Sequence, residues 1–274
     1  GELITLVAGP PLVEGGHSIP RDASSAAAAK AYGTDDVPSV AALYYKAASP
    51  GRPTVVFWHG NADQLGWGAA YIGQQLNAKY GLGFFAIEYP GYSASTGLRT
   101  SEAAIYLASE QLLQHLSSPQ GLAIPAHQVI LMGQSVGGGA AVEMAARGHG
   151  ARVVLLSPFA SIAKMAESAF PLVTPGVRAF PFMVRDRFDN LAKIEAGKVS
   201  QELLVLHGDR DSIVPFSQGE GLVAAKGDGA RLVRLKGTDH NDIFGGRVEA
   251  QVLREIADFA LAESRSSGAR QTGG

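Results

Sequence analysis

Five short, uninterrupted apolar runs constrain the fold of this chain more than any other feature. They are Val55–Trp58, Phe84–Ile87, Val129–Met132, Val153–Leu156 and Leu203–Leu206. A strand with one buried face alternates apolar and polar residues, whereas a strand inside a parallel sheet is buried on both faces and is apolar throughout. The runs therefore predict parallel strands, and Leu232–Leu235 is a weaker candidate for a later one.

Stretches with helical spacing separate these runs. The best candidates are residues 69–79, 102–116, 138–147, 219–225 and 248–261. Alternation of strand and helix predicts an α/β fold, with a mostly parallel central sheet and helices on both faces. Right-handed crossovers then place the loops that follow the strands at one edge of the sheet, where such folds carry their sites.

Two regions depart from this alternation. For residues 1–50 we predict antiparallel edge strands, with Tyr44–Tyr45 as the best strand candidate. Residues 24–30 are predicted to form a short helix or a loop. Residues 159–190 are rich in Phe and Met but interrupted by Pro, which predicts a small helical cap inserted into a single domain spanning 1–274. The polar stretch 264–274 predicts a disordered tail.

Composition narrows the classes of partner. The chain has 23 basic and 25 acidic residues and a net charge of -2, with no run of Lys or Arg, so we expect no nucleic-acid partner. It has no cysteine, which excludes disulfides, thiolate metal sites and a cysteine nucleophile. No apolar run reaches the roughly 18 residues of a membrane span. We expect membrane association only through a segment absent from this chain. The compartment stays open: cytoplasmic, or periplasmic or membrane-tethered if an N-terminal segment has been removed.

One serine lies where a reactive hydroxyl would be expected. Residues 133–137 read Gly-Gln-Ser-Val-Gly, which matches G-x-S-x-G. The motif follows the apolar run Val129–Met132 and precedes a helical stretch from Gly138, which is the strand–turn–helix context of a nucleophile elbow. The two glycines meet a steric need in that strained turn, and the following helix points its positive end at Ser135. We predict Ser135 as the nucleophile.

A serine nucleophile needs a base and an acid. His240 lies in a loop between the last predicted strand and the final helix, and we predict it as the general base. Asp211 directly follows the run Leu203–Leu206 and is the predicted acid that orients the histidine. Asp209 is the rival acid.

The tetrahedral intermediate of such a reaction carries an oxyanion, which fixed N–H donors must stabilise by hydrogen bonds. We predict the backbone N–H groups of Val136, directly after the nucleophile, and of Asn61, in the loop His59–Ala62 that follows an earlier strand. Asn61 as a turn residue only is the alternative. His59 is expected to brace this loop rather than to take part in the chemistry.

Together these segments resemble the α/β-hydrolases, in particular the serine hydrolases of the Bem46, ABHD13 and ABHD17 groups. The residues that carry the resemblance are Phe57–Ala62, Glu88–Tyr92, Gly133–Gly137, Asp211 with Val214-Pro215, and His240–Asp242. The resemblance implies the α/β-hydrolase fold and a triad of Ser135, His240 and Asp211. Some members of the family are thioesterases that remove palmitoyl groups from proteins.

The predicted function is hydrolysis of carboxylic esters or thioesters through an acyl-enzyme, with no metal and no organic cofactor. The partner would be a small-molecule or acylated substrate. Apolar residues of the predicted cap suggest an acyl pocket formed by Phe159, Met165 and Phe182, and Tyr92 could border it. The alternatives are a serine peptidase and a non-catalytic binding protein on a hydrolase scaffold.

Overall fold

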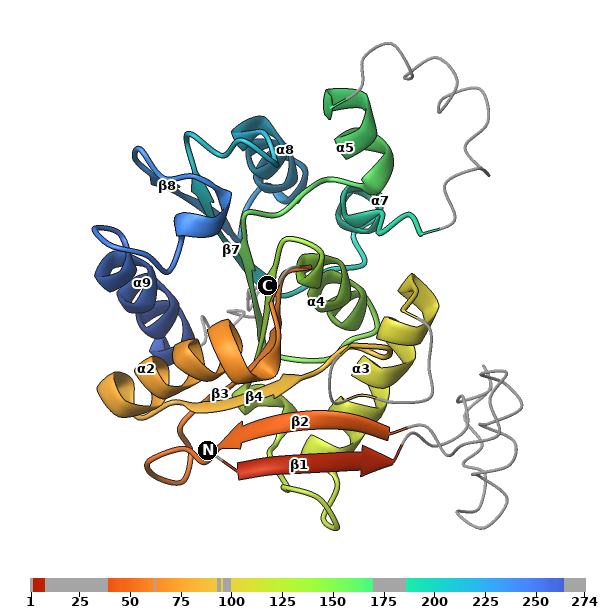
Figure 1. The fold of residues 1–274 in the computed structure, drawn as a ribbon, viewed down its shortest axis with the longest axis vertical. Helices are drawn as coiled ribbons and strands as arrows, with labels where there is room; N and C mark the ends of the chain where they lie inside the picture. Colours follow the sequence, from red (N-terminus) through yellow and green to blue (C-terminus); the bar gives the residue numbers. More distant parts are fainter. Residues whose placement is uncertain are drawn as a thin grey trace, which may run out of the picture.

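The central element of the computed structural model is a single twisted sheet. The structure describes residues 2–7, 39–61, 63–92, 95, 100–169 and 186–263. Within these residues eight strands pair in the order β1-β2-β4-β3-β5-β6-β7-β8 (Figure 1). The strands are β1 (Glu2–Val7), β2 (Ser39–Tyr45), β3 (Thr54–Trp58), β4 (Gly83–Ile87), β5 (Val129–Gln134), β6 (Arg152–Leu156), β7 (Glu202–Gly208) and β8 (Ala230–Leu235).

The pairing confirms the predicted mostly parallel sheet. From β4 through β3, β5, β6 and β7 to β8, every neighbour is parallel. The N-terminal strands β1 and β2 are antiparallel, and β1 forms the edge while β2 lies between β1 and β4. Tyr44–Tyr45 ends β2, as expected, whereas the predicted segment 24–30 lies outside the described residues.

Helices cover both faces of this sheet, which explains the continuous apolar runs within its central strands. Alternate residues of one strand belong to different cores: Val56 packs with one hydrophobic cluster, and its neighbours Val55 and Phe57 pack with the other. The first cluster includes residues from α3 (Glu102–Ser117), α4 (Gly137–Ala146), α7 (Asn190–Glu195) and α8 (Phe216–Lys226). The second includes residues from α2 (Ala70–Tyr80) and α9 (Glu249–Leu261), which lie together on the other face in Figure 1.

Among the described residues, three short helical turns lie between the longer elements. The structure also describes part of the predicted cap. A π-helical turn, η1 (Leu65–Ala69), precedes α2, and the 3-10 turns are η2 (Ala126–Gln128) and η4 (His240–Asp242). Within the predicted cap, α5 (Ile162–Ala169) and the start of α7 are described. Residues 170–185 of the cap and the predicted tail 264–274 lie outside the described residues.

Two-sided burial makes the middle of the sheet sensitive to lost volume. Leu155 is fully buried in β6, whereas Leu261, at the end of α9, is 39% exposed. We expect Leu155→Ala to lower the free energy of unfolding by about 3 kcal/mol, because it removes buried methyl groups and leaves a cavity. Leu261→Ala is the control and should cost less than about 1 kcal/mol. Chemical denaturation of both variants checks this, and equal losses would contradict the packing described.

Candidate active site

The predicted nucleophile lies at a sharp turn between a central strand and a helix. Ser135 follows β5 directly and precedes α4, and its φ of 51° is in the left-handed region that side chains other than glycine rarely adopt. Its N–H donates to the carbonyl of Leu156 on β6 at 2.9 Å, which fixes the turn to the neighbouring strand. This is the geometry expected of a nucleophile elbow, with the N-terminus of α4 directed at the turn.

The two glycines of the motif are required because backbone passes closely on both sides of the turn. A side chain at position 133 would collide with the backbone of Gly137, and one at 137 would collide with the carbonyl of Trp58. The steric reason inferred from the sequence is therefore visible in the packing of β3, β5 and α4.

His240 and Asp211 are brought together by the loops that follow β8 and β7. His240 is buried at the start of η4, and its Nδ1 lies 2.8 Å from Asp211 Oδ2. The second oxygen of Asp211 accepts the N–H groups of Ile213 at 3.0 Å and Val214 at 2.7 Å. The carboxylate is thus held at both oxygens, and it fixes which nitrogen of His240 carries a proton.

A second histidine, which the sequence reasoning missed, also contacts this carboxylate. His207 Nε2 lies 3.2 Å from Asp211 Oδ2 and 3.0 Å from the carbonyl of Val214. Burial alone raises the pKa of Asp211, but hydrogen bonds from His207, His240 and the Val214 amide outweigh it and hold that pKa well below its usual value. Asp211 is therefore ionised at neutral pH. The i,i+4 spacing of His207 and Asp211 was the only sequence signal for this contact.

Neighbouring aspartates have other tasks. Asp209, the rival acid, accepts the N–H of Gly237 at 2.7 Å and is not hydrogen-bonded to His240. Asp239 accepts the N–H of Ser212 and the N–H of His240, both at 2.7 Å, so it ties the Asp211 loop to the His240 loop. Hydrogen bonds from the Ser212 and His240 amides lower the pKa of Asp239. The sequence reasoning did not single out Asp239.

The predicted oxyanion donors are both available. Neither the N–H of Val136 nor that of Asn61 donates a hydrogen bond to another residue in the described part of the chain. The two loops are close: a Cβ built on Gly60 would lie 3.9 Å from Ser135 Cβ. His59 is fully buried beneath this loop and contacts Glu88 at 3.0 Å, in keeping with the bracing role suggested for it.

Ser135 and His240 line one cavity of about 490 Å³. Among the described residues no hydrogen bond joins the Ser135 hydroxyl to His240. In unliganded enzymes such bonds are often long, and they tighten when substrate binds. The remaining lining residues are Gly60, Asn61, Asp63, Gly68, Tyr71, Ile72, Gln134, Ile213, Asn241 and Phe244.

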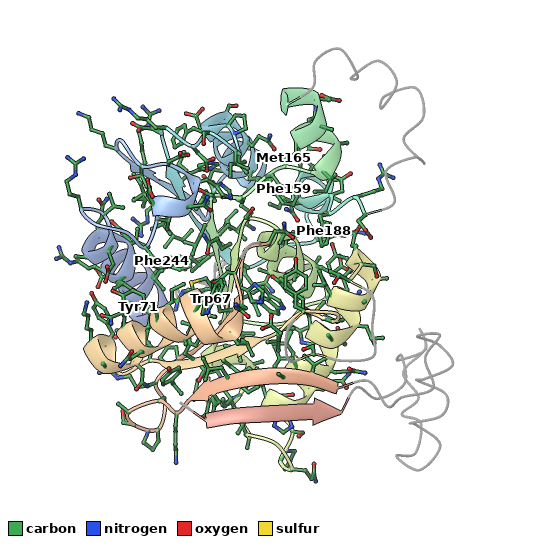
Figure 2. All side chains as sticks on the ribbon, in the orientation of Figure 1. Trp67, Tyr71, Phe159, Met165, Phe188 and Phe244 are labelled. Carbon is green, nitrogen blue, oxygen red and sulfur yellow. The ribbon has the colours of Figure 1, made fainter. Side chains whose placement is uncertain are left out.

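Among the described residues, the apolar wall of this cavity does not include the residues predicted for it. It comes from Tyr71 and Ile72 of α2, Ile213, and Phe244 after η4, and Figure 2 shows Tyr71 and Phe244 on the same side of the molecule. The structure describes three of the four predicted pocket residues, and none of the three lines this cavity.

Those three residues have other contacts. Phe159 packs in the core against Phe188, and the sulfur of Met165 lies 3.6 Å from the Gln218 amide. Tyr92 donates to Asn61 instead of facing the cavity. The fourth, Phe182, lies outside the described residues, so its role stays a prediction.

The described residues contain neither a metal-binding cluster nor a membrane-spanning helix. No three His, Asp or Glu side chains there are grouped to hold a metal ion. In the same residues, no helix has the length and apolarity needed to cross a membrane.

Comparison with known proteins identifies the family of this chain. The model of a family described as "Serine aminopeptidase, S33" (Hydrolase_4) matches residues 49–187, which is half of the chain. Human α/β hydrolase domain-containing protein 17B is 30% identical over 225 residues, which are 82% of this chain and 72% of that protein. The chain belongs to the α/β-hydrolase family. The mouse protein 17C is 31% identical over 226 residues, covering 82% of this hydrolase and 65% of the relative.

Solved structures share the fold of this hydrolase at low sequence identity. An esterase from Pyrococcus furiosus superposes with a TM-score of 0.65 at 15% identity, over 82% of this chain and 88% of that one. A monoacylglycerol lipase from Paleococcus ferrophilus gives 0.59 at 19% identity, over 81% and 98%. Family membership therefore assigns the general activity, hydrolysis, and leaves the residues and the substrate to the site itself.

The contacts of the two aspartates lead to opposite expectations. Asp211→Ala should slow labelling of Ser135 by a fluorophosphonate by roughly 10⁴, because His240 loses the partner that sets its tautomer. Asp209→Ala should leave most of the labelling rate, since it removes only a contact with Gly237. Rates of labelling on the intact protein measure both, and the reverse order would move the acid to Asp209.

Proposed function

We propose that this hydrolase cleaves carboxylic esters or thioesters with neutral, apolar acyl groups through a covalent acyl-enzyme on Ser135. The observation that carries the proposal is the contact of His240 with the ionised Asp211, whose side chain is buried, at a cavity that His240 and Ser135 both line. A base held in one tautomer beside a serine in a strained turn is the arrangement that activates a hydroxyl.

In the first half of the reaction, the Ser135 oxygen attacks the carbonyl carbon while His240 Nε2 takes the hydroxyl proton. The electron pair of the C=O bond moves to the oxygen, which would accept hydrogen bonds from the N–H groups of Val136 and Asn61. Asp211 stabilises the imidazolium that forms. Collapse of the intermediate breaks the bond to the leaving alcohol or thiol, which receives the proton from His240.

In the second half, water replaces the alcohol or thiol. His240 takes a proton from that water as its oxygen attacks the acyl carbon, and the same two N–H groups would hold the second oxyanion. Collapse breaks the bond to the Ser135 oxygen, which recovers its proton from His240. The products are a carboxylic acid and the free enzyme.

The cavity supports an apolar acyl group. Four of its lining side chains, Tyr71, Ile72, Ile213 and Phe244, are apolar or aromatic, and Asp63 is the single charged carboxylate among the described lining residues. No Lys or Arg from the described part of the chain lines it to hold an acidic group on the substrate. A neutral acyl chain is therefore favoured over one that ends in a carboxylate.

The central test is hydrolysis of p-nitrophenyl esters and matched thioesters of increasing acyl length by the purified protein. Ser135→Ala should lower kcat by roughly 10⁴ or more, because the nucleophile is gone. His240→Ala should abolish labelling by a fluorophosphonate. Turnover that survives Ser135→Ala would refute the mechanism, and an intact protein that is never labelled would instead be a binding protein on a hydrolase scaffold.

Aminopeptidase activity is the second candidate, because the matching family is described by that activity. Such an enzyme must hold a substrate ammonium group. Asp63 could do so, but its Oδ1 already accepts the N–H groups of Gln64 at 2.8 Å and Gly68 at 2.9 Å. This capping use of Asp63 favours the esterase.

The two candidates differ in how they depend on Asp63. We expect hydrolysis of a p-nitrophenyl ester but no measurable turnover of an aminoacyl p-nitroanilide, and Asp63→Asn should change ester hydrolysis little, because asparagine keeps the acceptor oxygen. Steady-state kcat and KM for both substrates distinguish the esterase from the aminopeptidase. Turnover of the anilide that is lost in Asp63→Asn would establish the peptidase.

A further inference from the structure

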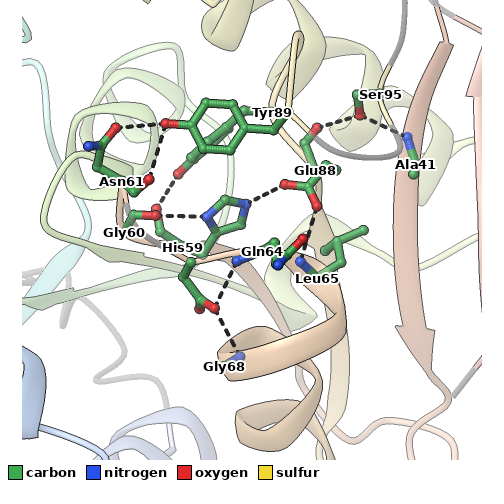
Figure 3. A network of polar contacts seen from close by, with 12 residues as sticks. Ala41, His59, Gly60, Asn61, Gln64, Leu65, Gly68, Glu88, Tyr89 and Ser95 are labelled. Atoms are coloured by element: carbon green, nitrogen blue, oxygen red, sulfur yellow. Dashed lines mark hydrogen bonds and ion pairs between the residues drawn. The ribbon is translucent and has the colours of Figure 1, made fainter.

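A fully buried ionisable pair lies beneath the loop that carries Asn61, and the proposed mechanism does not use it. His59 follows β3 and is 0% exposed, and Glu88 follows the neighbouring strand β4 and is 1% exposed. Their side chains meet at 3.0 Å between Nε2 and Oε1 (Figure 3). Burying such a pair costs desolvation free energy, so a pair kept beneath this loop is expected to have a function.

The hydrogen bonds of the pair determine where its protons lie. His59 Nδ1 is 2.9 Å from the carbonyl of Gly60, which can only accept, so Nδ1 carries a hydrogen. Glu88 Oε2 accepts the N–H of Leu65 at 3.2 Å. A second proton must therefore lie between Nε2 and Oε1. With two protons the pair has no net charge, and its contribution is to hold His59 in one orientation.

The Gly60 carbonyl is the informative contact, because it belongs to the same peptide unit as the Asn61 N–H. A trans peptide is planar, and its oxygen and its hydrogen point in opposite directions. When His59 holds the oxygen toward the buried pair, the N–H of Asn61 is turned the other way. Gly60 and Asn61 both line the cavity that contains Ser135.

The peptide units on either side are held in the same manner. The hydroxyl of Tyr89 donates to the carbonyl of His59, and the hydroxyl of Tyr92 donates to Asn61, to Oδ1 at 2.6 Å and to the carbonyl at 3.2 Å. Side chains thus hold three consecutive carbonyls, and the Gly60 carbonyl also accepts the N–H of Asp63 at 3.2 Å. The Asn61 N–H is left without a partner among the described residues.

We propose that His59, held by Glu88, is a positioning residue that orients the Gly60–Asn61 peptide so that the Asn61 N–H faces the reacting carbonyl, and that Tyr92 supports the next peptide. This inference rests on the proposed function. It differs from a purely structural role, because it assigns the effect to one ring nitrogen, Nδ1.

Two substitutions separate the nitrogens of His59. The amide nitrogen of asparagine can replace Nδ1, and that of glutamine can replace Nε2. His59→Asn should keep the contact with Gly60 and retain kcat within roughly tenfold, whereas His59→Gln should lower kcat roughly a hundredfold, in line with a misplaced oxyanion donor. KM should change little in both, since the donor acts on the transition state.

The readout specific to positioning is the affinity for a trifluoromethyl ketone, which forms a tetrahedral adduct with the serine. Its inhibition constant should rise in His59→Gln by the same factor by which kcat/KM falls. Equal losses in both variants, or a change confined to KM, would overturn the proposal. Thermal unfolding of each variant accompanies the kinetics.

A second pair of variants keeps the test decisive if position 59 does not tolerate substitution. Tyr92→Phe removes the hydroxyl that holds Asn61 and should lower kcat roughly tenfold with KM nearly unchanged. The control is Tyr106→Phe, which removes a hydroxyl bonded to Glu102 and Lys193, away from the cavity, and should leave kcat unchanged. Equal kcat values in the two variants would overturn the proposal. A wild-type protein that neither hydrolyses esters nor is labelled at Ser135 would instead refute the proposed function.

Discussion

Parallel pairing of β3, β5, β6, β7 and β8 is the constraint on which the rest of this structure depends. In a parallel sheet with helical crossovers, all strands end at the same edge, so the loops after β3, β5, β7 and β8 must meet there. These loops carry Asn61, Ser135, Asp211 and His240. The sheet keeps this register because helices bury both of its faces, and a shift of one residue would exchange the two cores.

Buried polar contacts refine what the sheet brings together. Asp211 is held at both oxygens, by backbone amides on one side and by two histidines on the other. Asp239 joins the two loops concerned. On the other side of Ser135, the His59–Glu88 pair holds the loop of Asn61. Hydrogen bonds thus tie the loops of the site to one another and to the sheet, while the Val136 and Asn61 amides have no partner among the described residues and could serve a reaction.

Prediction from sequence worked best where the physical cause was local. The turn at Ser135 needs small residues on either side, and this need is written into Gly133 and Gly137. Two-sided burial makes a strand continuously apolar, so most strands could be recognised directly, and β8, which is half exposed, gave the weaker signal. The pocket was harder to predict. Phe159 and Met165 are apolar because they pack against the core, while the described apolar wall comes from Tyr71, Ile213 and Phe244, on three segments far apart in the chain.

The sequence by itself determined the alternation of strands and helices, the strained turn at Ser135 and the order of the segments that end at one edge of the sheet. Only the tertiary structure decided which of two aspartates, separated by a single residue, contacts His240, and that His207 and Asp239 support them. It also decided that Tyr92 holds Asn61. The physical reason is that steric and burial requirements act on neighbours in the chain, whereas hydrogen-bond partners are chosen by loops that meet only after the sheet has formed.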